Sequence, residues 1–368
     1  MAGMNDLLAL GQSVWLDYIR RGLVRGGELK GLVEQGLRGL TSNPSIFEKA
    51  IAGSNEYDAD LRAAIRRTPD ADAGALFEEL AVVDIREAAD VLAGVWRSSG
   101  GQDGYVSLEV SPHLAHDTAR TIADARRLWT AVGRPNLMIK VPATPAGVPA
   151  VEALIAEGIN VNATLMFSLA HYEAIANACL RGLERCERPE RVASVASFFV
   201  SRVDSVIDPQ LDAIGSPAAA ALRGRAAVAN AKLAYARYQQ LFGAPFAGLR
   251  ARGAKPQRVL FGSTGTKDKA YPDVKYVEEL IGPDTVNTLP PETIAAFLDH
   301  GTARVTLTQN VDAAARVVDE LRALGIDIDV VTEALQADGV VKFAEAFDKL
   351  LAAIEAKRDM VLEPVAKL

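Results

Sequence analysis

Short apolar runs rich in Val, Ile, Leu and Thr recur along the chain, and longer stretches with helical spacing of apolar residues separate them. Eight runs predict β-strands, at Ser13–Ile19, Leu37–Asn43, Tyr105–Ser111, Leu137–Ala143, Asn160–Met166, Val192–Ser197, Arg258–Thr264 and Thr285–Leu289. Helices are predicted in the gaps, for example at Asn55–Arg67, Leu76–Ser98, His116–Val132, Leu169–Cys186 and Ala218–Leu241. This alternation indicates parallel strands with crossover helices, and eight units favour a (β/α)8 TIM barrel over a doubly wound open sheet.

Two segments exceed what a minimal barrel needs. A helical insertion is expected at about 204–255, between the sixth and seventh strands, where Ser216 and Pro217 are suited to begin a helix. A helical C-terminal extension is expected at about 311–368. The sequence contains no Ser/Gly-rich linker and no repeat of fixed period, so we expect one barrel domain over residues 1–368.

Polar side chains share one face near the ends of several predicted strands. Successive residues of a strand face opposite sides, so Lys140 faces away from Ile139, and Glu109 faces away from Leu108. The same parity selects Asp17, Thr41, Asn43, Glu109, Lys140, Asn162 and Thr164. Because active sites of such barrels lie at the C-terminal ends of the strands, we expect these side chains to converge there.

Composition and charge narrow the function classes. The 368 residues carry a formal net charge of −7, which gives no support to binding of nucleic acids or anionic membranes. Cys179 and Cys186 form no CxxC motif and no Cys/His cluster, so neither a metal site nor a disulfide framework is expected. The N-terminus does not resemble a signal peptide and no apolar run reaches about 18 residues, so we expect a cytoplasmic protein.

Lys140 is the most informative polar residue, because lysine is rarely buried within an apolar strand. Desolvation favours the neutral amine, which can attack a carbonyl group to form a Schiff base. Asp17 and Glu109 could carry the protons that imine formation requires. One alternative remains open at this point: a structural ion pair between Lys140 and Glu109 or Asp17.

Four motifs resemble those of transaldolases, in the longer bacterial branch of the family. They are "GLTSNPSIF" (Gly39–Phe47), "LMIKVPATPAG" (Leu137–Gly147), "INVNATLMFS" (Ile159–Ser168) and "VASFFVSRVD" (Val195–Asp204). The resemblance implies transfer of a dihydroxyacetone unit between sugar phosphates in the pentose phosphate pathway, through a lysine Schiff base and without a metal or cofactor. It leaves the oligomeric state open between a monomer and a homodimer. Two other functions are weighed against it: a Schiff-base aldolase that releases free dihydroxyacetone, and a sugar-phosphate-binding barrel without catalysis, against which the two carboxylates that accompany Lys140 argue.

The resemblance also assigns catalytic roles. It makes Lys140 the Schiff-base lysine and Asp17 the group that exchanges the proton of the substrate hydroxyl during C–C cleavage. It makes Glu109 the proton carrier in imine formation, acting through a water molecule that Thr164 positions.

Substrate-binding roles follow from the same resemblance. Asn43, Asn162 and Ser197 would contact the substrate, with Thr41 beside them. Phe199 would form an apolar wall that favours transfer over free aldol cleavage. For the phosphate, the resemblance implies Arg202 and Ser263. The shorter branch has a second arginine where this chain has Gly265, and we expect Lys267 to replace it.

Overall fold

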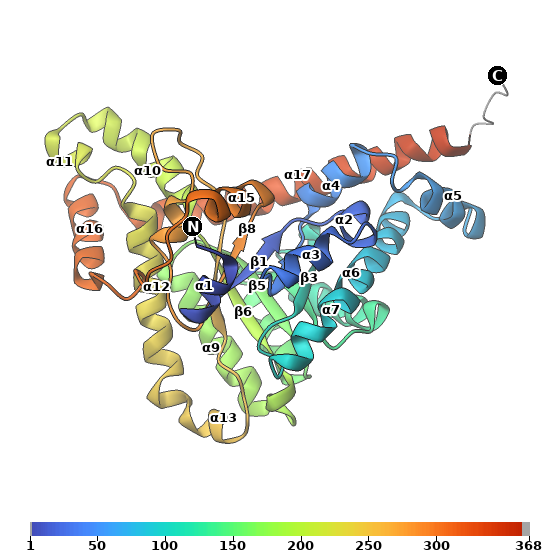
Figure 1. Ribbon diagram of the computed structural model, residues 1–368, viewed down its shortest axis with the longest axis horizontal. Helices are drawn as coiled ribbons and strands as arrows, with labels where there is room; N and C mark the ends of the chain where they lie inside the picture. Colours follow the sequence, from blue (N-terminus) through green and yellow to red (C-terminus); the bar gives the residue numbers. More distant parts are fainter. Residues whose placement is uncertain (1, 363–368) are drawn as a thin grey trace.

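Eight parallel strands close into a barrel in the computed structural model, which describes residues 2–362 (Figure 1). The strands are β1 (Gln12–Asp17), β2 (Gly39–Thr41), β3 (Tyr105–Glu109), β4 (Leu137–Pro142), β5 (Val161–Met166), β6 (Ser194–Phe199), β7 (Arg258–Gly262) and β8 (Thr285–Leu289). Each strand pairs with its neighbours in chain order, and β8 pairs with β1 to close the ring. The predicted barrel is confirmed, all eight predicted strands are present, and the open sheet is excluded.

Helices surround this barrel. They are α1 (Met4–Ala9), α2 (Arg21–Arg25), α3 (Glu28–Glu34), α4 (Pro44–Ala52), α5 (Asp58–Arg67), α6 (Ala73–Ser98), α7 (Thr118–Val132), α8 (Gly147–Ala156), α9 (Leu169–Arg185), α10 (Ser201–Ile214), α11 (Pro217–Ala220), α12 (Ala226–Phe242), α13 (Ala247–Ala251), α14 (Lys275–Glu278), α15 (Pro291–His300), α16 (Val311–Ala323) and α17 (Ile328–Leu362). Short 3-10 helices are η1 (Pro112–Leu114), η2 (Pro189–Arg191) and η3 (Ala244–Phe246). None of the helices within residues 2–362 combines the length and the apolar character that a membrane span requires.

The two faces of each strand have separate packing partners. Leu137, Ile139 and Val141 of β4 belong to the large apolar core that includes the surrounding helices. Met138, on the opposite face, belongs to a smaller apolar cluster with Trp15 of β1 and residues of the other strands. That smaller cluster fills the barrel interior below the polar strand ends, as the alternation of side chains requires.

The second strand is shorter than predicted, because the chain turns into α4 at Asn43. The Asn43 side-chain Oδ1 accepts a hydrogen bond of 3.0 Å from the backbone N–H of Ile46. Asparagine is a favoured N-cap residue, and Pro44 fits the first helical position because its missing N–H would have no helical partner. Asn43 is therefore held by the start of a helix and not by the sheet.

The predicted helix Ala218–Leu241 is wrong as a single element, since the chain forms α11 and α12 with a turn between them. Gly224 adopts a φ of +66° in this turn, a backbone conformation that ends a right-handed helix. The Ser216 hydroxyl does cap α11, accepting a hydrogen bond of 3.2 Å from the Ala219 N–H, as expected from the sequence.

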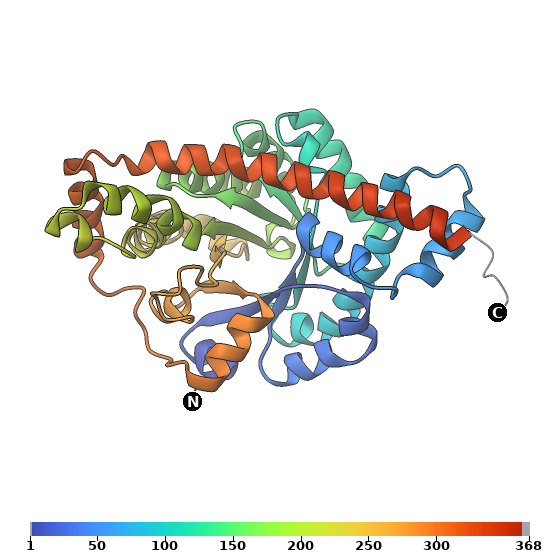
Figure 2. The same ribbon diagram turned by 90° about the horizontal axis from the view of Figure 1, so that it is seen from above.

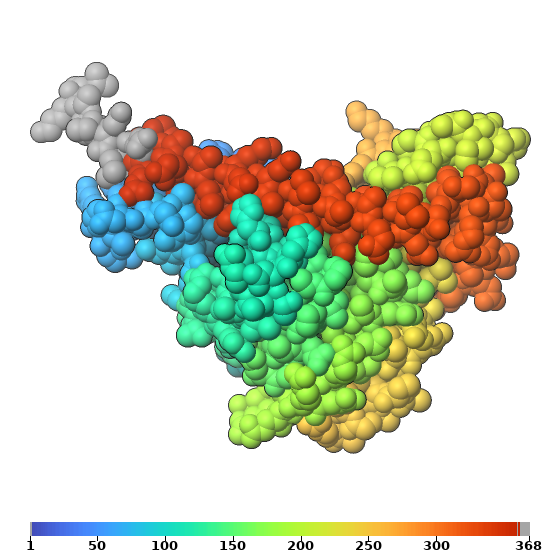
Figure 3. Space-filling model, turned by 180° about the vertical axis from the view of Figure 1, so that it is seen from behind, coloured from blue at the N-terminus to red at the C-terminus, as the bar shows by residue number. Residues whose placement is uncertain are grey.

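The C-terminal helix α17 crosses the width of the molecule (Figures 2 and 3). It packs against α4, α10 and β5. The buried Gln336 side chain donates hydrogen bonds of 3.0 Å to the carbonyl oxygens of Ala143, which follows β4, and Leu165, the penultimate residue of β5. A side chain at Gly339 would begin 3.1 Å from Leu165, so glycine lets the helix approach the strand closely. These contacts place α17 over the C-terminal end of the barrel.

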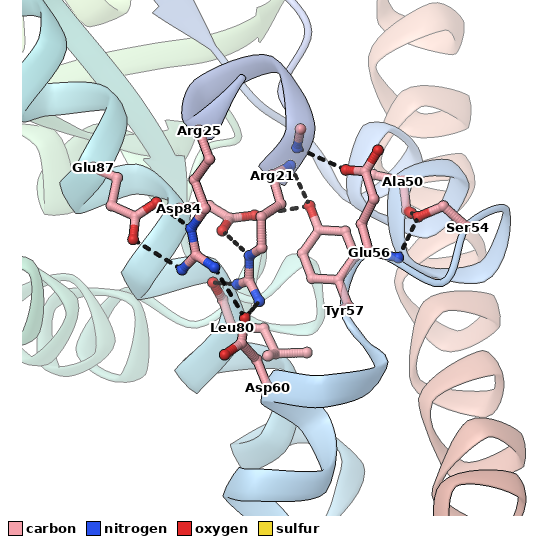
Figure 4. A network of polar contacts seen from close by, with 11 residues as sticks. Arg21, Arg25, Ala50, Ser54, Glu56, Tyr57, Asp60, Leu80, Asp84 and Glu87 are labelled. Atoms are coloured by element: carbon pink, nitrogen blue, oxygen red, sulfur yellow. Dashed lines mark hydrogen bonds and ion pairs between the residues drawn. The ribbon is translucent and has the colours of Figure 1, made fainter. Parts of the chain in front are cut away.

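A buried ionic network joins α2 to α5 and α6 outside the barrel (Figure 4). The Arg21 Nε lies 2.8 Å from Asp84 Oδ1, and the Tyr57 hydroxyl donates to Asp84 Oδ2 at 2.8 Å. The Arg21 guanidinium also pairs with Asp60 and contacts the Tyr57 ring. Burial raises the pKa of Asp84, and the charge of Arg21 opposes this effect. Removing either Arg21 or Asp84 would leave a buried charged group without its main partner and would destabilise the fold.

Candidate active site

A cavity of about 160 Å³ lies at the C-terminal end of the barrel. Its lining residues are Asp17, Thr41, Asn43, Ser45, Lys140, Thr164, Ser197, Phe199, Arg202, Leu260, Gly262, Ser263, Thr288 and Phe343. Nine of the twelve predicted site residues are among them. Larger hollows of about 730 and 600 Å³ lie elsewhere and are lined by other residues. The smaller cavity is therefore the candidate active site, because it contains the reactive groups.

Lys140 lies at the centre of the polar set. The register of β3, β4 and β5 places it between Glu109 and Asn162. Its Nζ donates a hydrogen bond of 3.0 Å to the Ser42 carbonyl and lies 3.5 Å from Glu109 Oε2. The Lys140 side chain is only 6% exposed, so its amine is nearly excluded from solvent yet still borders the cavity.

Glu109 lies beside the amine and outside the cavity lining. Both of its carboxyl oxygens are buried, and neither has a hydrogen-bond partner among residues 2–362; the Thr164 hydroxyl is in the same condition. Burial raises the pKa of Glu109, while the positive charge of Lys140 lowers it. Unsatisfied buried polar atoms are rare and costly, and here they belong to the two residues for which the sequence predicts a proton-carrying role.

Asp17 is oriented by a chain of hydroxyl groups. The Thr41 hydroxyl donates to Asp17 Oδ1 at 2.8 Å, and the Thr288 hydroxyl lies 2.8 Å from the same Thr41 oxygen. Because the single Thr41 proton is used on the carboxylate, Thr288 is the donor to Thr41. Burial raises the pKa of Asp17, and the charge of Lys140 opposes this effect. Because of its burial, Asp17 therefore accepts a proton more readily than an exposed aspartate does.

Asn162 lies behind the cavity wall. Its Nδ2 donates to the Ser107 hydroxyl at 3.0 Å, and its Oδ1 accepts from the Ser197 hydroxyl at 2.6 Å. Ser197 lines the cavity, so Asn162 acts on the site by holding Ser197 in place. Asn43 does line the cavity, but its Oδ1 is engaged in capping α4, which leaves its amide N–H groups for a ligand.

A positive end of the cavity is formed by α10 and the loop after β7. The Arg202 guanidinium lies 5.3 Å from the centre of the Phe199 ring. Burial lowers the pKa of Arg202, and the charges of Asp338 and Asp17 oppose this effect. Ser263 has a φ of +54° and accepts a 3.0 Å hydrogen bond from the Ser201 N–H. This arrangement presents a guanidinium and a hydroxyl near the N-terminus of α10, where an anion is favoured.

Lys267 does not line the cavity but lies near its positive end. Burial lowers the pKa of Lys267, and the charges of Arg202 and Lys342 lower it further. Like charges brought together in this way favour an anionic ligand, which would relieve their repulsion.

Five of the fourteen lining residues were not predicted as site residues from the sequence: Ser45, Leu260, Gly262, Thr288 and Phe343. Thr288 is the penultimate residue of β8 and its side chain points inward, so strand parity could have identified it, just as parity places Ser107 on the face of Glu109. Phe343 comes from α17, and its ring centre lies 6.0 Å from Lys140 Nζ. No local pattern around Phe343 distinguishes it from an ordinary apolar helix position.

Known proteins resemble this chain over nearly its whole length. The model of the transaldolase/fructose-6-phosphate aldolase family matches residues 14–354. A transaldolase from Frankia alni is 49% identical over 358 residues, covering 95% of this chain and 96% of the relative. A transaldolase from Thiobacillus denitrificans is 49% identical over 95% of this chain and 99% of its own, and one from Neisseria gonorrhoeae is 47% identical over 96% and 99%. The chain belongs to the transaldolase/fructose-6-phosphate aldolase family.

Proposed function

We propose that this chain is a transaldolase of the pentose phosphate pathway that works through a Schiff base on Lys140. It would transfer a dihydroxyacetone unit from sedoheptulose 7-phosphate to glyceraldehyde 3-phosphate, giving erythrose 4-phosphate and fructose 6-phosphate. The observation that carries the proposal is the buried Lys140 amine at the cavity, 3.5 Å from Glu109, with Asp17 lining the same cavity.

The first stage is formation of the imine. The neutral Lys140 amine attacks the ketone carbon of the donor, and the carbinolamine that results loses water. Glu109 and Thr164 have buried oxygens without hydrogen-bond partners among the described residues, which suits proton transfer to the departing hydroxyl through a water molecule. The raised pKa of Glu109 favours its protonated form, which is the form that can donate.

The second stage is cleavage and transfer. Asp17 takes the proton from the hydroxyl of the departing fragment, which leaves as an aldose phosphate while the electrons of the broken C–C bond enter the protonated imine. The acceptor aldose then takes the place of the first product, and the same steps run in reverse. Phe199 offers no hydroxyl that could activate water, so the covalent intermediate would persist until an acceptor arrives.

Reductive trapping tests the mechanism. The protein is incubated with fructose 6-phosphate, reduced with borohydride, digested, and mapped by mass spectrometry. We expect a reduced adduct on Lys140. An unmodified Lys140, or an adduct on Lys49 or Lys267 instead, would contradict the mechanism.

Dependence on the acceptor tests the reaction type. We expect cleavage of fructose 6-phosphate to be slow alone and fast once erythrose 4-phosphate is added as acceptor. Equal rates in both conditions would instead identify an aldolase that releases free dihydroxyacetone.

A further inference from the structure

The C-terminal helix α17 contributes directly to the cavity. Its Phe343 lines the site, and Gln336 ties the helix to the ends of two barrel strands. These contacts fix both the position and the rotation of α17 over the barrel (Figure 2). Residues that flank Phe343 on the helix surface are therefore held at defined places around the mouth of the site.

Asp338 and Lys342 are two such residues, and their side of α17 is called the flank below. They lie one helical turn apart, and the Lys342 Nζ is 2.6 Å from Asp338 Oδ2. Helix α17 packs against α10, which carries Arg202. The charge of Asp338 acts on Arg202, and the charge of Lys342 acts on Lys267. The flank thus borders the positive end of the cavity.

The charges around the positive end of the cavity are unbalanced. Three positive groups, Arg202, Lys267 and Lys342, lie near two carboxyl groups, Asp338 and Asp17, in a chain whose net charge is −7. The side chain of Lys342 is 61% exposed, so its long apolar stem can change conformation at little cost. A phosphate, which carries nearly two negative charges at neutral pH, would balance the cluster.

We propose that Lys342 binds the phosphate of the sugar substrate together with Arg202 and Lys267. It supplies a positive charge from the C-terminal helix in a site where Gly265 provides no side chain. On substrate binding, the Lys342 ammonium turns from Asp338 toward the phosphate. The inference rests on the proposed function, since it names a further group that holds the same substrate.

The test is kinetic and uses the full chain. Lys342→Gln should raise the KM for fructose 6-phosphate about tenfold, with kcat within about twofold of wild type, because a charge-assisted hydrogen bond to the phosphate is lost. Lys342→Arg should restore most of the loss because it keeps the charge. Lys349→Gln is the matched control, since Lys349 is exposed on the same flank about 10 Å further along α17. It should leave KM unchanged.

A donor without phosphate separates this inference from the proposed function. Borohydride trapping of dihydroxyacetone on Lys140 should proceed equally in wild type and Lys342→Gln. A KM for fructose 6-phosphate within twofold of wild type in Lys342→Gln, or an equal rise in Lys349→Gln, would overturn the role of Lys342. Absence of any Lys140 adduct in the wild-type protein would instead overturn the Schiff-base mechanism.

Discussion

Asp204 makes the stability of this protein depend on pH in a defined direction. It lies on α10 two residues after Arg202 and is 1% exposed. Its carboxyl oxygens accept hydrogen bonds from the Ala227 N–H at 2.7 Å and the Tyr276 hydroxyl at 2.8 Å. Burial raises its pKa from 3.8 to about 6, and these two hydrogen bonds oppose the effect. Asp204 thereby fastens the segment after β7, which carries Lys267, to the helix that carries Arg202.

The direction of this pH dependence follows from which state, folded or unfolded, binds the Asp204 proton more tightly. Since the folded protein holds the Asp204 proton more tightly than the unfolded chain, this carboxyl stabilises the fold when protonated, and that stability is lost as pH rises through about 6. The full effect is about 3 kcal/mol, reached only below about pH 4. Between pH 8 and pH 5 about 1.4 kcal/mol of it develops.

The perturbation is Asp204→Asn, which removes the titration and keeps the shape of the side chain. Urea unfolding followed by circular dichroism gives the free energy of unfolding of both proteins at pH 5, 6, 7 and 8. We expect the wild type to gain about 1.4 kcal/mol relative to the variant between pH 8 and pH 5. The change Asp212→Asn, at an exposed position of the same helix, controls for the loss of a surface carboxyl. A difference that does not vary with pH, or that falls toward pH 5, would refute the reasoning.

Three further changes test other parts of the structure. Glu109→Gln should slow formation of the borohydride-trapped adduct about 100-fold, measured by rapid quench, because general acid–base catalysis is lost while phosphate binding is spared. Loss of donor binding would instead make Glu109 a structural partner. Asp84→Ala should cost about 3–5 kcal/mol of unfolding free energy in urea titrations, because the buried Arg21 keeps only the half-exposed Asp60 as an ionic partner and the Tyr57 hydroxyl loses its acceptor. Glu87→Ala, in a surface pair, should cost at most about 1 kcal/mol. Phe199→Tyr should raise acceptor-independent release of dihydroxyacetone several-fold, and an unchanged rate would show that the apolar wall does not limit hydrolysis.

The sequence by itself determined the strands and the direction of their side chains. Alternation along a strand is a local property, so Lys140 and Glu109 could be assigned to the barrel interior, and Ile139 to the helices, from neighbouring residues alone. The family motifs added the chemical roles, and the closed barrel is present as predicted.

Tertiary structure decided which groups complete the site. Thr288 reaches Thr41 only because β8 closes the ring near β1 and β2, and this contact joins residues 247 positions apart. Phe343 reaches Lys140 only because α17 lies across the barrel mouth. Asn162 shares the interior face but is held behind Ser197, since the space inside a small barrel admits only some of the inward side chains to the cavity. Such contacts depend on long-range packing, which leaves no periodic trace in the local sequence.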